Sequence, residues 1–494
     1  MMIEEYIEQD GLGLAKLVRA REVTPTELVD CAISRIQSLN QRLNAVIHEM
    51  FDKARAQAAG PVGDGPFAGV PFLVKDLDGY LAHEPYTASC RALVGFVPDH
   101  DAEIMARFKR AGLIILGKTN TPEGGLLGVT ESVLRGPARN PWQPEHVPGG
   151  SSGGSASAVA ARMVPLAHGG DGGGSIRIPA SACGLFGLKP TRARNPLGPD
   201  DGEGWNGQVV SHVLTRSVRD SAAVLDAVSG ADRGAPYVAP PSPRPFLEEV
   251  GAPAGKLKIA FTTASLFGKS VHPDCVAAVE DAVTLLQDLG HEVSEAKPEY
   301  DKEALIRAYF IVVSAGTAAF VAKAAKVTRR RVRRQEFEPV TWFLAQLGRR
   351  LSALELEQAR ATMHQAGRSL APFFERYDLL LTSTLAYPPV KVGELALTPV
   401  QRLGLALMRA VPARKLLVAA LDALAPPAFE PMPNTQLFNQ TGQPAVSLPL
   451  YWNAAGLPIG VQLVARFGGE AMLLRIGAQL ETARPWTTRR PQVI

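Results

Sequence analysis

The sequence predicts an α/β fold in which helices cover a central sheet, and two observations lead to this prediction. Short apolar runs of strand length alternate along the chain with segments of helical periodicity. The chain has 494 residues, of which 46% are hydrophobic and 20% charged, values typical of a globular protein with a large core. At this length it forms either two or three average domains or one large α/β domain.

The first elements are set by clear boundary signals. Residues 12–58 are predicted to form two helices, and Thr24-Pro25-Thr26-Glu27 marks the start of the second. A short apolar strand follows at 70–74. A helix near 101–111 then leads into a second strand at 113–116, which is apolar throughout and therefore predicted to be buried.

The remaining elements continue the same alternation. The predicted order is a helix at 156–164, a strand at 184–189, a proline-rich surface loop at 235–245, a strand at 258–261, a helix at 273–289, a mostly helical peripheral region at 303–375 interrupted near Pro339, a strand at 379–382, an apolar insert at 396–432, and two strands joined by a turn within 443–464.

Charge and cysteine usage exclude several classes of protein. The net charge of +4 does not indicate nucleic-acid binding, and the basic run Arg329–Arg334 is interpreted as a solvated face. Four cysteines lie far apart without a metal-binding spacing, so no disulfide framework and no metal site are expected.

The acidic segment Met1–Asp10 does not have the pattern of a signal peptide, and no uncharged apolar run of membrane-spanning length is present. A cytoplasmic protein without a membrane partner is expected.

A glycine-rich segment, Asp171-Gly172-Gly173-Gly174-Ser175-Ile176-Arg177, carries the first candidate chemistry. Three successive glycines free the backbone and present bare N–H groups to a ligand. The hydroxyl of Ser175 follows them directly, so a nucleophile stands beside donors for a developing oxyanion, as acyl transfer requires. Taken alone, the segment is also compatible with a tight turn or with an anion-binding nest without chemistry.

A second serine, Ser151, lies in the pattern Gly-x-Ser-x-Gly, which is typical of the nucleophile elbow of α/β-hydrolases. That elbow needs a strand before the serine, whereas residues 140–148 contain several prolines. It also needs a partner histidine, and the downstream candidates are all interpreted as surface residues: His212, His272, His291 and His364. The elbow interpretation is therefore disfavoured.

Lys75 ends the apolar strand 70–74. A lysine at a buried strand end can lose its proton, because burial disfavours the charged ammonium. Most strand-end lysines are simply solvated, so Lys75 becomes a candidate general base only together with the two serine segments.

Together, these segments resemble the amidase signature family. The resemblance rests on Lys75, on the run Gly149–Gly154, on the segment 171–180, and on the spacing from Ser151 to Ser175. Further matching motifs are Gly117-Lys118-Thr119-Asn120, the stretch from Cys183 to Thr191, Gly442-Gln443-Pro444-Ala445 and the segment from Gly456 to Gln462. The resemblance covers nearly the whole chain, and the C-terminal stretch is most similar to the branch that includes 6-aminohexanoate cyclic dimer hydrolase.

The resemblance implies a single large domain with a mixed twisted sheet, covered by helices on both faces, and a catalytic triad. Ser175 takes the position of the nucleophile, Ser151 that of the serine in a cis peptide bond, and Lys75 that of the base. In this mechanism the proton of Ser175 passes through Ser151 to neutral Lys75, an acyl-enzyme forms, and activity rises towards alkaline pH. No metal and no organic cofactor is implied.

The resemblance also assigns supporting roles around the triad. The glycines Gly172, Gly173 and Gly174 match the oxyanion hole, Ser152 matches a supporting hydroxyl, and Asp171 with Arg177 resembles an ion pair that braces the loop. One departure is Gly170, because the family commonly has threonine there. The hydroxyl of that threonine is therefore absent here or is replaced by another group.

The implied function is hydrolysis of a small-molecule amide, with ester or carbamate cleavage as a side activity. The apolar insert and the helical region 303–375 favour an apolar, aryl or oligoamide substrate, although both are equally explained by core packing. Basic residues of the insert, among them Arg409 and Arg414, also allow it to lie on a membrane surface. A glutamine amidotransferase subunit of a tRNA-dependent complex and a non-catalytic anion-binding protein are the alternatives, and a homodimer is left open.

Overall fold

The computed structural model describes residues 1–401, 404 and 414–491. Eleven strands form one sheet in the order β1-β3-β2-β6-β8-β7-β12-β13-β11-β9-β10. The strands of this sheet are β1 (Val46–Glu49), β2 (Pro71–Lys75), β3 (Ile114–Thr119), β6 (Leu166–Asp171), β7 (Phe186–Lys189), β8 (Val210–Thr215), β9 (Lys258–Phe261), β10 (Glu292–Glu295), β11 (Leu379–Ser383), β12 (Ala445–Trp452) and β13 (Pro458–Ala465). Two short strands, β4 (Glu131–Ser132) and β5 (Gly136–Pro137), pair separately.

The sheet is mixed, as the resemblance to the amidase signature family implies. Towards one end β3, β2 and β6 run parallel, and at the other end β11, β9 and β10 do so. Between them the neighbours from β6 through β8, β7, β12 and β13 to β11 are antiparallel. The parallel pair β2 and β6 matters most for the site, because it brings the ends of two strands that are far apart in the sequence to the same edge.

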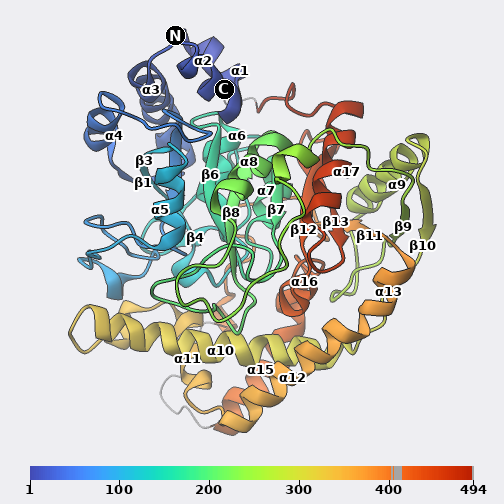
Figure 1. Cartoon of the computed structure of the whole chain (residues 1–494). Helices are drawn as coiled ribbons and strands as arrows, with labels where there is room; N and C mark the ends of the chain where they lie inside the picture. Colours follow the sequence, from blue (N-terminus) through green and yellow to red (C-terminus); the bar gives the residue numbers. More distant parts are fainter. Residues whose placement is uncertain (402–403, 405–413, 492–494) are drawn as a thin grey trace.

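Helices flank this sheet (Figure 1). Their bounds are α1 (Ile3–Glu8), α2 (Gly11–Arg19), α3 (Pro25–Leu43), α4 (Phe51–Ala58), α5 (Glu103–Arg110), α6 (Gly153–Ala160), α7 (Arg177–Cys183), α8 (Val218–Val228), α9 (Pro273–Asp288), α10 (Lys302–Val327), α11 (Pro339–Gly348), α12 (Ala353–Ser369), α13 (Ala371–Arg376), α15 (Arg414–Phe429), α16 (Gln436–Thr441) and α17 (Glu470–Ala483). The start of α3 follows its sequence signal, since Thr24 caps the helix and Glu27 closes a capping box.

The long helices α10, α11 and α12 lie together along one side of the sheet (Figure 1). In the part of the chain that the structure describes, α10 is the one helix long and apolar enough to cross a membrane by length and composition. It packs against α11 and α12, and 44% of its apolar window is buried in the fold. Core helices of folded proteins share these properties, so this observation alone is weak evidence for a membrane span.

The observed elements differ from the prediction in several places. Residues 12–58 contain three helices and the strand β1 instead of two helices, and helix α6 begins earlier than predicted, at Gly153. Strands β6 and β8 were not predicted. Both are fully buried, but β6 contains two glycines and β8 has polar Ser211 and His212, so neither shows the apolar pattern of a core strand.

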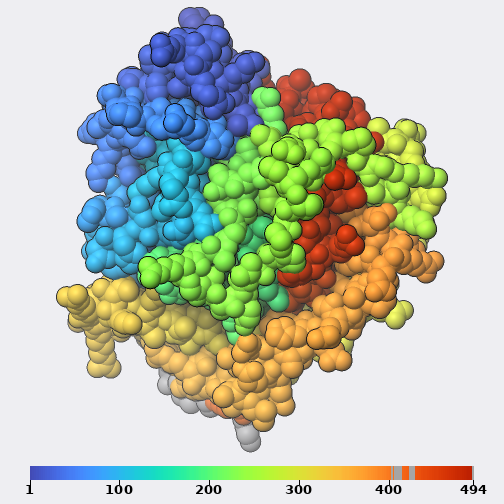
Figure 2. All heavy atoms as spheres, in the orientation of Figure 1, coloured from blue at the N-terminus to red at the C-terminus, as the bar shows by residue number. Residues whose placement is uncertain are grey.

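The apolar insert predicted at 396–432 lies partly outside the described residues. Its described part includes α15, in which Leu417 and Leu421 are buried against the cluster that α10, α11 and α12 build. Leu416 is exposed. The segment that follows β7, from about residue 190 to 250, lies across the face shown in Figure 2, between the N-terminal part and the C-terminal strands.

Candidate active site

Two parallel strands bring the first components of the site together. Leu73 of β2 pairs with Ala167 of β6, so the carboxyl ends of both strands point to the same edge of the sheet. Lys75 is the last residue of β2, and Asp171 is the last residue of β6. The glycine-rich segment that follows Asp171 therefore begins close to the amine of Lys75, although about a hundred residues separate them in the sequence.

A second loop, the one before α6, meets the glycine-rich segment at this edge. The backbone N–H of Ser152 donates to the carbonyl oxygen of Ser175 at 3.3 Å. The hydroxyl of Ser152 exchanges two hydrogen bonds, each 3.3 Å, with the backbone of Gly170. Ser152 is completely buried and is not among the residues that line the cavity. Its hydrogen bonds tie the loop before α6 to the end of β6.

The amine of Lys75 donates a hydrogen bond to the hydroxyl oxygen of Ser151 at 2.9 Å. Both side chains are almost completely buried, and the Gly150–Ser151 peptide bond is cis. Ser175 lines the same cavity as Lys75 and Ser151. Among the described residues, the Ser175 hydroxyl makes no hydrogen bond, so the structure links two of the three predicted side chains directly and places the third beside them.

The glycine-rich loop is held in a conformation that only glycine adopts easily. Gly174 has φ of +123°, and a Cβ atom there would lie 2.3 Å from Thr435 Oγ1. Its N–H donates to Asp171 Oδ1 at 2.7 Å. Within the described chain, no acceptor is assigned to the N–H groups of Gly172, Gly173 and Ser175, and of these residues Gly172 and Ser175 line the cavity.

Asp171 and Arg177 form the ion pair that the resemblance implies. Arg177 Nη2 lies 2.9 Å from Asp171 Oδ1, Nε lies 3.0 Å from Oδ2, and neither side chain is exposed. Burial acts to raise the pKa of Asp171, but the charge and hydrogen bonds of Arg177 lower it below its ordinary value. Arg177 also donates to Thr435, Gln462 and Asn439, so one guanidinium ties the loop to the C-terminal part of the chain.

Two residues near Lys75 were not predicted from the sequence. Asp78 accepts a hydrogen bond from Lys75 Nζ at 3.0 Å, and His168 accepts one from the Lys75 backbone N–H at 3.3 Å. A sequence signal for Asp78 was available, since it lies three residues after Lys75 and beside a glycine. His168 has no such signal, because strand β6 itself was not recognised.

The interpretation of four histidines as surface residues is wrong for two of them. His212 is completely buried on β8, where Nε2 lies 2.9 Å from Ser221 Oγ. His291 is 6% exposed and contacts Gln479. The sequence did not reveal the burial of His212, because the burial of β8 depends on its neighbours β6 and β7. In the described chain, the strand before Ser151 is β5, which ends at Pro137, so no strand leads directly into Ser151 as a nucleophile elbow requires.

Burial of histidines makes the stability of the protein dependent on pH. Burial first, and the charge of Lys75 second, lower the pKa of His168 from 6.5 to about 3, and burial lowers the pKa of His212 to about 3. Between these values the unfolded chain binds protons that the folded chain does not bind. Stability is therefore lost as the pH falls from about 6.5 towards 3, by about 1.4 kcal/mol per pH unit for each histidine.

This dependence can be measured by thermal unfolding between pH 8 and pH 4. His212→Gln is expected to weaken the dependence of the melting temperature on pH, because glutamine keeps a polar partner for Ser221 and does not titrate. Exchange of the exposed His83 for glutamine is the matched control and should leave the dependence unchanged. Equal slopes for His212→Gln and the wild type would show that His212 does not remain neutral in the folded protein.

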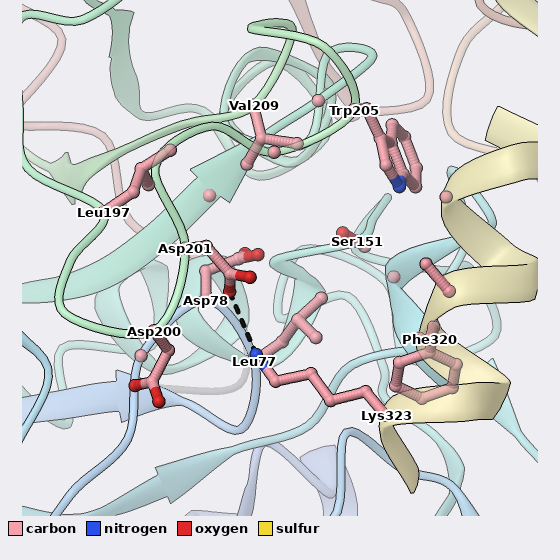
Figure 3. A pocket seen from close by; sticks show the side chains of 18 of the residues that line it. Leu77, Asp78, Ser151, Leu197, Asp200, Asp201, Trp205, Val209, Phe320 and Lys323 are labelled. Carbon is pink, nitrogen blue, oxygen red and sulfur yellow. Dashed lines mark hydrogen bonds and ion pairs between the residues drawn. The ribbon is translucent and has the colours of Figure 1, made fainter. Parts of the chain in front are cut away.

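The cavity above these residues has a volume of about 430 Å³. Its floor contains Lys75, Ser151 and Ser175. Its walls are mainly apolar and aromatic, and they include Leu77, Leu126, Leu197, Trp205, Val209 and Phe320. At the mouth, Lys323 of α10 reaches across to Asp201 at 3.1 Å, with Asp200 nearby (Figure 3).

In the described part of the chain, His, Cys, Asp and Glu residues do not gather in any group that could hold a metal ion. The groups available for chemistry at the floor of the cavity are an amine, two hydroxyls, a carboxylate and backbone N–H donors. Hydroxyl nucleophiles with an adjacent base and free N–H donors are the components of acyl transfer.

Comparison with known proteins agrees with this chemistry. Residues 27–474 match the family model described as Amidase. The chain is 37% identical over 496 aligned positions to 6-aminohexanoate-cyclic-dimer hydrolase of Paenarthrobacter ureafaciens, covering 98% of this chain and 97% of the relative. A structure of 6-aminohexanoate cyclic dimer hydrolase complexed with substrate superposes with a TM-score of 0.89, at 35% identity and 99% coverage of both chains.

A more distant structure is that of a bacterial aryl acylamidase belonging to the amidase signature enzymes, with a TM-score of 0.84 at 26% identity, covering 97% of this chain and 96% of that one. The fold and the site define a hydrolase that acts on amide bonds, in agreement with the names of the relatives. The chain belongs to the amidase family, whose members carry the amidase signature.

Proposed function

We propose that this protein hydrolyses small amides through an acyl-enzyme formed on Ser175, with Ser151 as proton relay and Lys75 as base. The observation that carries the proposal is the 2.9 Å hydrogen bond between Lys75 Nζ and Ser151 Oγ at the buried floor of a cavity that Ser175 also lines. The amine of Lys75 is within hydrogen-bonding distance of the Ser151 hydroxyl, so it is placed to exchange a proton with that group directly. We propose that the contact between Ser151 and Ser175 closes when substrate binds, as catalytic hydrogen bonds often do.

In the first half of the reaction, Ser175 Oγ attacks the amide carbonyl carbon. Its proton passes to Ser151, and the proton of Ser151 passes to Lys75. The oxyanion that forms is received by the unassigned N–H groups of Gly172, Gly173 and Ser175. Gly174 supports the same loop, but its N–H is directed to Asp171. Each donor of this kind contributes roughly 3–4 kcal/mol to lowering the barrier.

In the second half, the relay runs in reverse and protonates the leaving amine, because an unprotonated amide nitrogen leaves poorly. Water then attacks the acyl-enzyme, with the same residues accepting its proton. The ion pair of Asp171 and Arg177 and the hydroxyl of Ser152 act on this chemistry only indirectly, by holding the two loops in register.

The apolar lining of the cavity favours an aliphatic or aryl amide as the substrate, including a linear or cyclic oligoamide. Its walls carry leucine, valine, phenylalanine and tryptophan side chains, and hydrophobic burial would provide most of the binding energy. The relative named for hydrolysis of a cyclic 6-aminohexanoate dimer supports the same class. Buried, unpaired Cys31, Cys90, Cys183 and Cys275 agree with the proposed cytoplasmic location.

The proposal is tested by labelling with a fluorophosphonate probe, followed by peptide mass spectrometry. Label on Ser175 is expected in the wild type, and its rate should decrease strongly in Lys75→Ala because Ser175 is no longer activated. A panel of aryl amides, aliphatic oligoamides, esters, carbamates and glutamine then defines the substrate. Absence of label on Ser175, or turnover of glutamine alone, would overturn the proposal, the latter in favour of an amidotransferase subunit.

A further inference from the structure

Strand β6 contains a glycine whose small size, and not its backbone conformation, is required. Gly170 lies in the extended backbone of β6, and its φ is outside the left-handed region. A Cβ atom at this position would lie 2.0 Å from Asp78 Oδ2 and 2.6 Å from Asp78 Cγ. Contacts this short do not occur, so any side chain at position 170 is incompatible with the observed position of the Asp78 carboxylate.

The carboxylate in this space contacts the proposed base. Asp78 Oδ2 accepts from Lys75 Nζ at 3.0 Å, and the same amine donates to Ser151 at 2.9 Å. The side chain of Lys75 is 1% exposed and that of Asp78 is 16% exposed, so water has little access to the contact between them. Within the described chain, Asp78 and Ser151 are the two polar partners assigned to the Lys75 amine.

We propose that Asp78 is a positioning residue for Lys75 and that it takes the space that a side chain at position 170 would fill. A neutral amine has two N–H groups and one lone pair. When one N–H is held by Asp78, the lone pair can face the hydroxyl of Ser151, which is the orientation needed to accept a proton. When Lys75 takes that proton, the carboxylate stabilises the ammonium that forms.

This inference rests on the proposed function, since it assigns a role to Asp78 only if Lys75 is the base. It also explains the departure at Gly170. Threonine, which resembling sequences commonly carry there, would supply a hydroxyl beside the same loop, and here a carboxylate from the turn after β2 occupies that place. The positive φ of Asp78, +66°, agrees with a side chain held in one defined position.

The test is a double-mutant cycle with Asp78→Gly, Gly170→Thr and the double variant, in which kcat and KM are measured for an amide that the wild type hydrolyses. Asp78→Gly is expected to lower kcat by about 10- to 100-fold with little change in KM, because one charge-assisted hydrogen bond to the base is lost. Gly170→Thr should lower kcat by at least as much as Asp78→Gly does, since the new side chain displaces Asp78. The kcat of the double variant is expected to be about tenfold higher than that of Gly170→Thr, because the two changes together remove the clash and restore a hydroxyl.

Asp78→Asn separates charge from position. The amide keeps the shape and an acceptor oxygen but not the charge, so its kcat should lie between the values for the wild type and Asp78→Gly. Asp30→Ala is the matched control, because it removes an aspartate from a half-exposed ion pair with Arg55 that lies away from the cavity, and it should leave kcat unchanged. Melting temperatures of all variants distinguish loss of folding from loss of rate.

The inference is wrong if Asp78→Gly and Asp78→Asn keep kcat within twofold of the wild type. It is also wrong if the loss of kcat in the double variant equals the product of the losses in the two single variants. It fails separately from the proposed function. A wild type that carries fluorophosphonate label on Ser175, together with Asp78→Gly labelled at the same rate, rejects the role of Asp78 alone. A wild type without label on Ser175 rejects the mechanism and the role of Asp78 together.

Discussion

Replacement of Ser175 by alanine is expected to lower kcat for amide hydrolysis by about 10⁴- to 10⁶-fold. The loss is large because, in the proposed mechanism, Ser175 supplies the oxygen atom that forms the acyl bond. A loss of 10⁴-fold corresponds to about 5 kcal/mol in the barrier. Steady-state rates and the burst of released amine at high enzyme concentration measure it.

Two controls make the result specific to the nucleophile. Ser242→Ala, which removes a partly exposed hydroxyl that donates to the backbone carbonyl of Arg244, away from the cavity, should retain the rate of the wild type. Substrate binding to Ser175→Ala, measured by calorimetry, should persist, because the walls of the cavity are unchanged. If Ser175→Ala retains more than about one hundredth of the wild-type rate, the nucleophile has been assigned incorrectly.

Replacement of Arg177 by leucine is expected to destabilise the protein by about 3–5 kcal/mol. The change leaves the carboxylate of Asp171 buried without its counter-charge, and it removes the Arg177 donor from the side-chain oxygens of Gln462 and Asn439. The glycine-rich loop, which Asp171 holds through its bond to the N–H of Gly174, then loses its brace. The expected readouts are a melting temperature lower by several degrees and a reduced rate even below that temperature.

A cycle with Asp171→Asn identifies the cause. In the double variant Asp171→Asn/Arg177→Leu the buried negative charge is gone, so part of the stability lost in Arg177→Leu should return. Arg55→Leu removes an arginine from the half-exposed ion pair with Asp30 and should cost less than about 1 kcal/mol. An Arg177→Leu variant as stable as Arg55→Leu would contradict the assigned bracing role.

Much of the fold follows from local sequence patterns. Strand β9 and the two C-terminal strands β12 and β13 were predicted correctly because apolar residues and turn signals bound them on both sides. Strand β6 could not be predicted in this way. Its sequence contains His168, Gly169 and Gly170, and these residues form a strand only because β2 and β8 pair with it on both sides.

The same limit applies to the site. The resemblance to the amidase signature family pointed to Lys75, Ser151 and Ser175, and the structure places all three at one cavity. Their catalytic roles stay predictions until the variants are measured. Asp78 lies close to Lys75 in the sequence, but its proposed role was not identified because that role depends on the space left by Gly170 on a different strand, which no local pattern shows. Contacts of this kind become visible only in three dimensions.

Part of the cavity wall comes from stretches of the chain that follow the residues of its floor. The floor is built by residues between Lys75 and Ser175, whereas the walls include the segment 197–209 and one side of α10, from Gly316 to Val327. Under the proposed mechanism, part of the substrate selectivity is therefore encoded outside the stretch that carries the catalytic residues. Substitutions in the segments 197–209 and 316–327 can change which amides fit the cavity while leaving Lys75, Ser151 and Ser175 in place. New substrate preferences can therefore arise in these segments.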